Sequence, residues 1–365
     1  MPFWPEVSIF SRDASEWSQL LYDDREMCSK PAPTGYSVGL TAAHLIAAPI
    51  YAVAFYTLYA ERSANFKVYK RYLAAHAISN LIFELHLSVM MKPVLYLPYP
   101  AIRFAGLSVL RYVNGGITFF VFLLIIVATC WSIVELFDYR FRLISGSNLS
   151  SDWVKKFAKL AKILKRVLVV LATLTVCCLA LAAAGIFDQA EHKMKLEIIS
   201  TFPELLCRSA LVLPKAADTG IKPIHLFNIS AFFAVTVGTF LSFSQGIVSL
   251  MSLREMVIQT RTSMRTIAMH KAFLISLFCQ ISVHGVMMGF PVIIYGVSVI
   301  FNFDGNAIGY VAIVVASMHG AMSTLAMIIF NRPLYEKASS TIFTVFSSNN
   351  VIIRDISFIS MNNSR

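Results

Sequence analysis

Long stretches without charge constrain the fold of this chain more than any other feature of its sequence. No Asp, Glu, Lys or Arg occurs in residues 31–60, 112–134, 167–187, 223–253, 272–303 or 305–331, which are 21 to 32 residues long. A seventh apolar stretch, 72–91, contains one charged residue, Glu84. About 20 helical residues are enough to cross the hydrocarbon core of a bilayer. The sequence therefore predicts seven membrane-spanning helices.

The composition excludes the other broad classes of protein. Apolar residues make up 57% of the chain and charged residues 14%, whereas a soluble domain carries about 25% charged residues. Open strands cannot span lipid because their backbone groups would lack partners. We expect an all-α seven-helix transmembrane domain over 35–331, an N-terminal tail over 1–34 and a C-terminal tail over 332–365. The expected helices are 35–60, 72–95, 107–137, 166–187, 226–253, 272–300 and 307–330.

Basic residues predict the orientation of the bundle. With the N-terminus outside the cell, 20 of the 31 Lys and Arg residues fall in 61–71, 138–166, 254–271 and 332–365, which are then cytoplasmic. This asymmetry satisfies the positive-inside rule. The net charge of +11 is explained by these segments and by anionic lipid on the cytoplasmic side. We therefore expect no nucleic-acid partner.

A stripe of polar residues marks the second expected helix. His76, Asn80, Glu84, Ser88 and Lys92 recur every four residues and therefore share one face. A charge facing lipid costs at least about 2.5–3.5 kcal/mol, so this face is expected to contact other helices or water. Two interpretations of the carboxyl remain open: an ion or proton site that switches with conformation, or a structural group held by hydrogen bonds.

The sixth and seventh expected helices carry further polar residues inside the membrane. His284 is followed by Pro291, which kinks a helix and either allows it to pivot or produces a static bend. His319 and Ser323 share a face of the last helix. With Glu84, the two histidines form the candidate intramembrane switch. No metal or other cofactor is expected, because no further ligands lie near these histidines in sequence.

The two cysteines expected outside the membrane are a candidate disulfide pair. Cys28 lies in the N-terminal tail and Cys207 in the loop over 188–225. Oxidation is permitted outside the cell, so the alternatives are one bridge or two free thiols.

Four stretches of sequence carry a family resemblance. They are Ala-Pro-Ile-Tyr at 48–51; Glu-Leu-His-Leu-Ser at 84–88, with prolines at 93, 98 and 100; Glu-Leu-Phe-Asp-Tyr-Arg at 135–140; and Ser-Met-His-Gly-Ala-Met-Ser-Thr at 317–324, followed by Asn-Arg-Pro at 331–333. The rhodopsin-like Asp-Arg-Tyr and Asn-Pro-x-x-Tyr signatures are absent. The stretches resemble the nematode serpentine chemoreceptors of the Srh type and their Sri relatives. The last stretch is the most specific.

The resemblance implies an olfactory G-protein-coupled receptor rather than an enzyme. Such a receptor binds a small external cue, activates a heterotrimeric G protein and lies in the plasma membrane, in this family at a sensory-neuron cilium. Depth and polarity suggest a cue site that includes Tyr112, Asn114, Thr118, Phe232, Phe233, Tyr295 and Tyr310. The expected G-protein surface includes Asp138, Arg140, Arg254, Arg261 and Arg332. We expect Arg140 to be exposed there.

Two other classes of membrane protein are weighed against the receptor. A secondary transporter could use Glu84 and His284 as a proton relay, but transporters usually contain repeats, and this chain shows none. A ligand-gated channel of the insect odorant-receptor kind has its N-terminus inside, which the distribution of Lys and Arg opposes.

The segment after Pro333 is expected to form a short eighth helix on the inner leaflet. Tyr335, Ala338, Ile342 and Val345 recur at three- and four-residue steps, which places them on one apolar face. The run is too short to span a bilayer but can lie in its interface. The alternative is a disordered tail.

Overall fold

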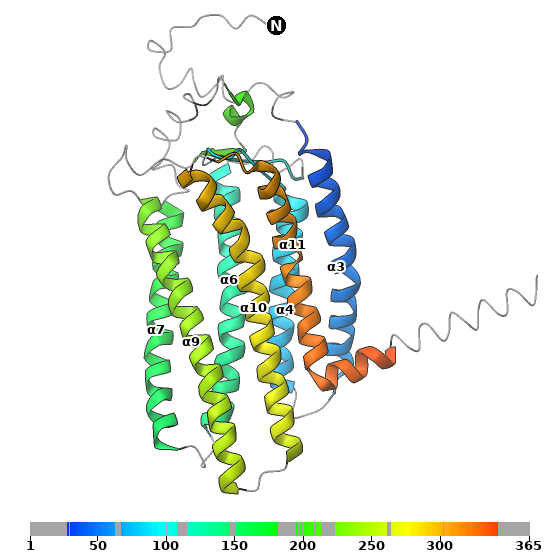
Figure 1. Cartoon of the computed structure of the whole chain (residues 1–365), viewed down its shortest axis with the longest axis vertical. Helices are drawn as coiled ribbons and strands as arrows, with labels where there is room; N and C mark the ends of the chain where they lie inside the picture. The colour runs from blue at the N-terminus through cyan, green and yellow to red at the C-terminus, as the bar shows by residue number, and fades with distance from the viewer. Residues whose placement is uncertain are drawn as a thin grey trace, which may run out of the picture.

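The computed structural model contains a bundle of seven long helices (Figure 1). It describes residues 28, 30–62, 67–99, 101–107, 115–146, 151–181, 195, 198, 201–207, 209–212, 223–260, 264–301 and 303–341. The bundle helices are α3 (Thr34–Ala60), α4 (Lys67–Leu85), α6 (Gly115–Ser145), α7 (Asp152–Leu181), α9 (Pro223–Thr260), α10 (Met264–Phe301) and α11 (Asn306–Phe330). Six of them are long and apolar enough to cross a membrane. The seventh, α7, has charged residues in its first half and none from residue 167 onward, where the predicted membrane span begins. The predicted seven-helix membrane fold is confirmed.

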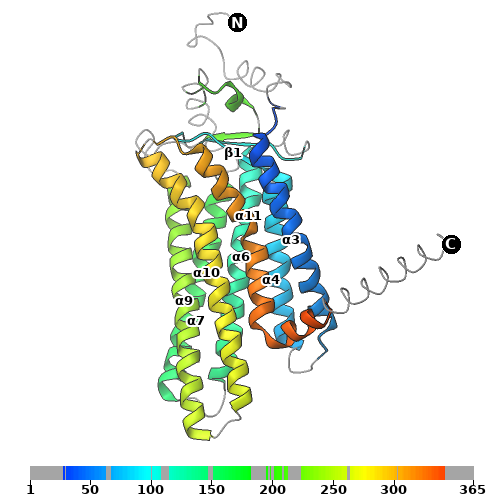
Figure 2. The same cartoon turned by 45° about the vertical axis from the view of Figure 1, so that its right-hand side comes forward.

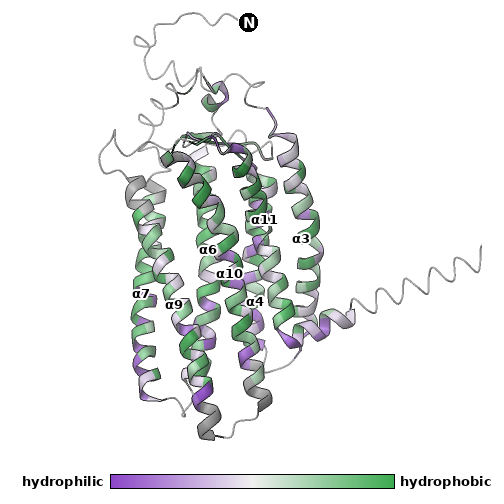
Figure 3. Ribbon diagram, in the orientation of Figure 1, coloured by the Kyte–Doolittle hydropathy of each residue, from purple (hydrophilic) through white to green (hydrophobic). Residues whose placement is uncertain are grey.

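Several helices extend beyond the bounds expected from hydropathy. α7 begins at Asp152 rather than at residue 166, and α6 continues to Ser145 rather than ending at residue 137. Both extensions carry charged residues, which are solvated readily once a helix has left the bilayer. Hydropathy marks the part of a helix that suits lipid, whereas backbone hydrogen bonding continues past that limit. Hydrophilic residues accordingly gather at the lower end of α7 (Figure 3).

The helix expected over 72–95 ends earlier than its sequence suggests. α4 passes into a π-helical segment, η2 (His86–Met91), and the helix stops at Lys92, whose φ of 40° is left-handed. Pro93 then begins strand β1 (Pro93–Leu95). A left-handed residue commonly terminates a helix, and proline cannot donate the backbone hydrogen bond that would continue it.

A small sheet covers one end of the bundle. β1 pairs with β2 (Ala101–Phe104), which pairs with β3 (Ala210–Val212), and both pairings are antiparallel. A short 3₁₀ helix, η4 (Pro203–Leu206), precedes β3. The sheet lies across the helix ends where α3 and α11 begin (Figure 2). We call this sheet with η4 the cap and its side of the bundle the cap end; the opposite side, where α11 finishes, is the tail end.

Buried apolar clusters hold the bundle together at both ends. At the cap end, Leu40, Phe83 and Phe104 belong to a cluster that joins α3, α4 and the sheet. At the tail end, Tyr69, Phe137 and Phe273 belong to a second cluster that joins α4, α6 and α10. The closest helix neighbours are α10 with α11, α7 with α9, α11 with α3, α6 with both α4 and α9, and α4 with α11. α4, α6 and α11 therefore occupy central positions in the bundle.

A short helix over 332–341 turns away from α11 at the tail end (Figure 1). Leu334 and Ala338 on one face are buried against the tail-end cluster. Tyr335, which is predicted to share this face, is 51% exposed. Ile342 and Val345, the other residues of the predicted apolar face, lie outside the described part of the chain.

Candidate functional site

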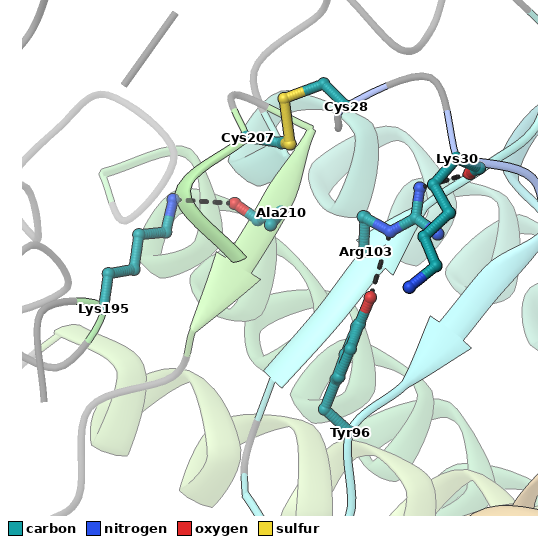
Figure 4. The surroundings of a disulfide bond; sticks show 7 residues. All are labelled: Cys28, Lys30, Tyr96, Arg103, Lys195, Cys207 and Ala210. Atoms are coloured by element: carbon teal, nitrogen blue, oxygen red, sulfur yellow. Dashed lines mark hydrogen bonds between the residues drawn. A yellow bond between two sulfur atoms is a disulfide. The ribbon is translucent and has the colours of Figure 1, made fainter. Parts of the chain in front are cut away.

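The cap is fastened by a buried arginine. Arg103 on β2 donates from Nε to the phenol oxygen of Tyr96 at 3.0 Å and from Nη1 to the backbone oxygen of Lys30 at 2.8 Å (Figure 4). Burial raises the pKa of Tyr96 to about 12, although the nearby Arg103 cation opposes this shift. The phenol is therefore neutral at ordinary pH. Arg103 thus ties the start of α3 to the sheet.

A disulfide joins Cys28 to Cys207 next to these contacts (Figure 4). Cys207 follows η4 directly and is fully buried. Lys195 donates to the backbone oxygen of Ala210 at 2.9 Å, and Lys30 forms an ion pair with Glu204 at 3.3 Å. The bond and these contacts hold the segment before α3 and the segment before β3 on the cap.

Of the candidate cue residues, two are described and buried or half-buried near the cap. Thr118 is buried near the start of α6. Tyr310 on α11 donates to the backbone oxygen of Leu95 at 3.3 Å and stacks on Tyr36 of α3 with ring centres 4.8 Å apart. Both lie where α6 and α11 meet the cap.

The remaining candidate cue residues are not brought to that place. Phe232 and Phe233 on α9 are 68% and 52% exposed, so they face away from the bundle interior. Tyr112 and Asn114 lie outside the described residues, and the side chain of Tyr295 is not described.

The polar stripe of α4 meets α6, α10 and α11 in the bundle interior. His76 lies 2.7 Å from the Ser132 hydroxyl of α6 through Nδ1 and 3.1 Å from the Ser323 hydroxyl of α11 through Nε2. Ser132 donates its proton to a backbone carbonyl, so Nδ1 of His76 is the donor in the first contact. The side chain of Asn80 lies between His76 Nε2 at 3.2 Å and His284 Nε2 at 3.3 Å.

Hydrogen bonds continue from this interior site along α10 to the tail end. His284 donates from Nδ1 to the backbone oxygen of Gln280 at 2.9 Å. Its Nε2 is then an acceptor in the neutral ring, so the 3.3 Å approach to Asn80 Oδ1 is a polar contact and not a hydrogen bond. The amide of Gln280 donates to the Ser276 hydroxyl at 3.0 Å. Asn331, which ends α11, donates to the same hydroxyl at 3.1 Å. We call the connected residues His76, Asn80, His284, Gln280, Ser276 and Asn331 the polar chain.

The three candidate switch residues fall into two groups. His284 and His319 lie together, with ring centres 4.8 Å apart in an edge-to-face contact. Glu84 instead pairs with His44 of α3, at 3.1 Å between Oε1 and Nδ1, and lies beside the Tyr51 hydroxyl. Within the described ranges, no three His, Cys, Asp or Glu side chains form a group that could hold a metal ion.

At the tail end, Asp138 is buried by bonds to neighbouring helices. Its carboxylate accepts from Lys165 of α7 at 2.6 Å and from Gln245 of α9 at 3.1 Å. Lys165 also pairs with Glu135 at 2.8 Å. Asp138 therefore joins α6 to α7 and α9, and in this conformation it is not an exposed contact surface.

Arg140 is buried, so the expectation that it is exposed is wrong for this conformation. Its side chain is 4% exposed, and its guanidinium carbon lies 3.5 Å from the ring centre of Tyr69 on α4 and 3.9 Å from that of Phe273 on α10. Two of its nitrogens, Nε and Nη2, have no hydrogen-bond partner among the described residues. We call Arg140, Tyr69 and Phe273 the arginine clamp.

Two of the other expected G-protein contacts are exposed at the tail end. Arg254 lies near the end of α9. Arg332 pairs with Glu336 at 2.6 Å within the helix over 332–341. Arg261 lies outside the described residues.

Sequence reasoning missed the partners that these polar residues find. Asn306 at the start of α11 exchanges two hydrogen bonds with the backbone of Leu97, at 2.8 and 3.0 Å. The sequence does not predict His44 as the partner of Glu84, or Tyr69 and Phe273 as the partners of Arg140. Contacts between segments distant along the chain leave no local pattern in the sequence, so these partners could not be predicted from it.

The fold and the site define a seven-helix membrane protein with a polar interior, a disulfide-linked cap at one end and a buried cation at the other. A family comparison gives the particular group: the serpentine type 7TM GPCR chemoreceptor Srh family matches residues 31–345. The match covers most of the chain, which belongs to this family of chemoreceptors rather than to an enzyme family. Searches of curated proteins and of solved structures found no significant match.

Proposed function

We propose that this protein binds a small cue outside the cell and activates a heterotrimeric G protein inside it. The cap end would be extracellular and the tail end cytoplasmic. The excess of Lys and Arg in the tail-end segments supports this orientation. We further propose the plasma membrane as its location and, from the family resemblance alone, a sensory cilium.

The proposed cue site lies under the cap, where α6, α10 and α11 meet it. It would include Thr118 and Tyr310, and we keep Tyr112, Asn114 and Tyr295 in the proposal. Phe232 and Phe233 are left out, because exposed apolar side chains on a membrane helix suit lipid. A cue need only bind one of two packings more tightly than the other to shift their populations.

The polar chain is the observation that carries the proposal. It joins α4, α10 and α11 by successive polar contacts at hydrogen-bond distance, from the bundle interior to the last residue before the tail-end helix. Polar groups inside a membrane protein are costly unless they are paired. A shift of α10 relative to α4 would therefore exchange several of these partners together, which favours discrete arrangements over continuous ones.

At the proposed cytoplasmic end, a movement of α10 would displace Phe273 and so weaken the arginine clamp. A cation over two aromatic rings contributes about 0.5–2 kcal/mol, and here the rings come from α4 and α10 while the cation comes from α6. The clamp would hold the three helix ends together in the resting state. Its release would offer the guanidinium group of Arg140 to the carbonyl or carboxylate groups of a G protein. Arg254 and Arg332 lie at the same end of the bundle, and we keep Arg261 in the proposed contact surface from its position in the sequence.

No contact between described residues supports the transporter alternative. A relay between Glu84 and His284 needs the two groups in hydrogen-bond contact, directly or through water. Among the described residues, Glu84 pairs with His44, whereas His284 contacts Asn80 and Gln280.

Weakening the clamp tests the proposal without knowledge of the cue. Phe273→Leu removes the ring over Arg140 but keeps apolar volume. We expect nucleotide exchange on added G protein, without cue, to rise about two- to tenfold, because tenfold corresponds to about 1.4 kcal/mol. Phe278→Leu is the matched control, since Phe278 on the same helix packs on Phe137 and Phe243 instead. Equal basal exchange in both variants and the wild type would contradict the proposed role of the clamp.

A further inference from the structure

A pocket lies on the flank of the bundle, between α3 and η2. Its volume is about 330 Å³, and its walls come from three segments. The lining residues are Leu40, Thr41 and His44 of α3; Ser88 and Val89 of η2 with Lys92 after it; and Ala105, Gly106 and Leu107 beyond β2. None of these residues belongs to the predicted cue or G-protein sites.

The inner wall of this flank pocket is built by backbone hydrogen bonds. The N–H groups of Ala105, Gly106 and Leu107 donate to the carbonyls of Lys92, Met91 and Val89, at 3.2, 3.0 and 3.2 Å. These carbonyls lie at the end of the π-helical segment, where a helix leaves acceptors without internal partners. A Cβ atom on Gly106 would lie 1.8 Å from the Met90 oxygen. Only glycine permits this close approach, so the wall has a fixed shape.

Lys92 supplies the charge of the flank pocket. Its left-handed backbone ends the π-helical segment and fixes the direction in which the side chain leaves it. Its ammonium donates to the Ser37 hydroxyl at 3.4 Å. No carboxylate in the described part of the chain lies within ion-pair distance of it. Because an ammonium has three donors, two remain for a ligand.

The other lining groups fit an anionic head on an apolar tail. Glu84, the nearest buried carboxylate, is paired with His44. The hydroxyls of Thr41 and Ser88 donate to backbone oxygens of their own helices. Lys92 is therefore the main free donor, and Leu40, Val89, Ala105 and Leu107 supply apolar walls. A cavity of about 150 Å³ accommodates benzene. The flank pocket has about twice that volume, about 330 Å³, and can therefore hold a molecule larger than benzene.

We propose that the flank pocket binds a small anionic amphiphile through Lys92, with a single carboxylate or phosphate head and an apolar tail of about six to ten carbons. The ligand could be a free acid from outside or the head and upper chain of an acidic phospholipid, since both present the same chemistry. The inference goes beyond the proposed function, because binding here requires neither a particular cue nor a G protein.

Octanoate is the first probe, with octan-1-ol as a neutral molecule of matching length. The full-length protein would be purified into nanodiscs of phosphatidylcholine, and its thermal unfolding midpoint measured during each titration. We expect a saturable rise with octanoate and none with octan-1-ol. Lys92→Gln should weaken octanoate binding at least about tenfold, since hydrogen bonds to charged groups are the stronger kind. Lys92→Arg should retain binding, and Lys162→Gln, at an exposed lysine of α7, should match the wild type.

Nanodiscs that contain phosphatidylglycerol distinguish the two sources of the ligand. If a phospholipid head occupies the pocket, the added lipid should raise the midpoint and weaken the octanoate response, and Lys92→Gln should remove both effects. If only a free acid binds, the octanoate response should be the same in both lipids.

A second variant keeps the test decisive if Lys92→Gln folds poorly. Val89→Phe fills the flank pocket without changing any charge and should abolish the octanoate response. Equal responses to octanoate and octan-1-ol, or a wild-type response in Val89→Phe, would overturn the proposal. Because no G protein is present, such a result would leave the proposed receptor function untouched.

Discussion

The guanidinium carbon of Arg140 on α6 lies 3.5 Å from the centre of the Tyr69 ring on α4. A buried cation is expensive unless it is paired, and this one is held by the π-faces of Tyr69 and Phe273. No carboxylate of the described residues forms an ion pair with it. Its Nε and Nη2 atoms find no hydrogen-bond partner among the described residues. The contact with the two rings offsets only part of the free-energy cost of burying the charge. We therefore explain it by the signalling role proposed above.

Replacing Arg140 by an apolar residue of similar length should separate folding from signalling. Apolar replacement of a buried charged group is often neutral or stabilising, so we expect Arg140→Met to keep the thermal unfolding midpoint of the purified protein within a few degrees of the wild type. Arg140→Ala leaves a cavity under two rings and should lose roughly 2 kcal/mol or more. A large loss of stability in Arg140→Met would indicate a structural cation instead.

Gly320 allows α11 to approach α3 and α4 closely. A Cβ atom at this position would lie 2.5 Å from the Tyr51 oxygen and 2.9 Å from the Asn80 Cβ atom. Overpacking of this kind costs about 1–3 kcal/mol, so Gly320→Ala should lower the unfolding midpoint. Gly285→Ala is the matched control, since nothing lies within 4 Å of its added Cβ atom. Adding Tyr51→Phe should restore part of the loss, and an unchanged midpoint in Gly320→Ala would refute the close packing.

The disulfide between Cys28 and Cys207 should stabilise the cap. Removing such a bond typically costs about 2–4 kcal/mol, so the double variant Cys28→Ser, Cys207→Ser should unfold at a lower temperature. Cys130→Ser, at a free and exposed cysteine, should behave as the wild type. Peptide mapping without reduction should recover the linked pair, and two alkylatable thiols at these positions would show that the bond does not form.

The helix over 332–341 should lie along the inner leaflet. Spin labels at Tyr335, on the exposed side, should contact lipid, whereas labels at Lys337 should contact water and labels at Ala338 should be immobilised against the bundle. Apolar area in the interface supplies the attraction. Water accessibility at all three positions would mean that the helix points away from the membrane.

The number and order of the helices could be predicted from the sequence, because lipid imposes a length and a polarity that the chain must carry locally. The charge-free stretches therefore predict the bundle, but not the start of α7 at Asp152, since a solvated helical extension has no hydropathy signal. The four-residue spacing of His76, Asn80 and Glu84 indicates a face that meets other helices. It does not say that Glu84 would pair with His44 on α3 while Asn80 meets His284 on α10.

Contacts between helices were harder still to predict at the candidate site. The position of Arg140 at the end of a long helix suggests exposure, and its burial depends on Tyr69 and Phe273, which lie far away along the chain. Phe232 and Phe233 have the polarity and depth of ligand contacts, yet the rotation of α9 turns them outward. Helix rotation is set by packing against neighbours and cannot be predicted from one segment alone.

The central claim is that Arg140, once released from its clamp, engages the G protein. Its most direct test is cue-independent nucleotide exchange on purified G protein by the double variant Phe273→Leu, Arg140→Met, compared with Phe273→Leu alone at equal amounts of folded receptor. The claim predicts raised exchange in the single variant and exchange no higher than that of receptor-free membranes in the double variant. Raised exchange that persists without Arg140 would contradict it.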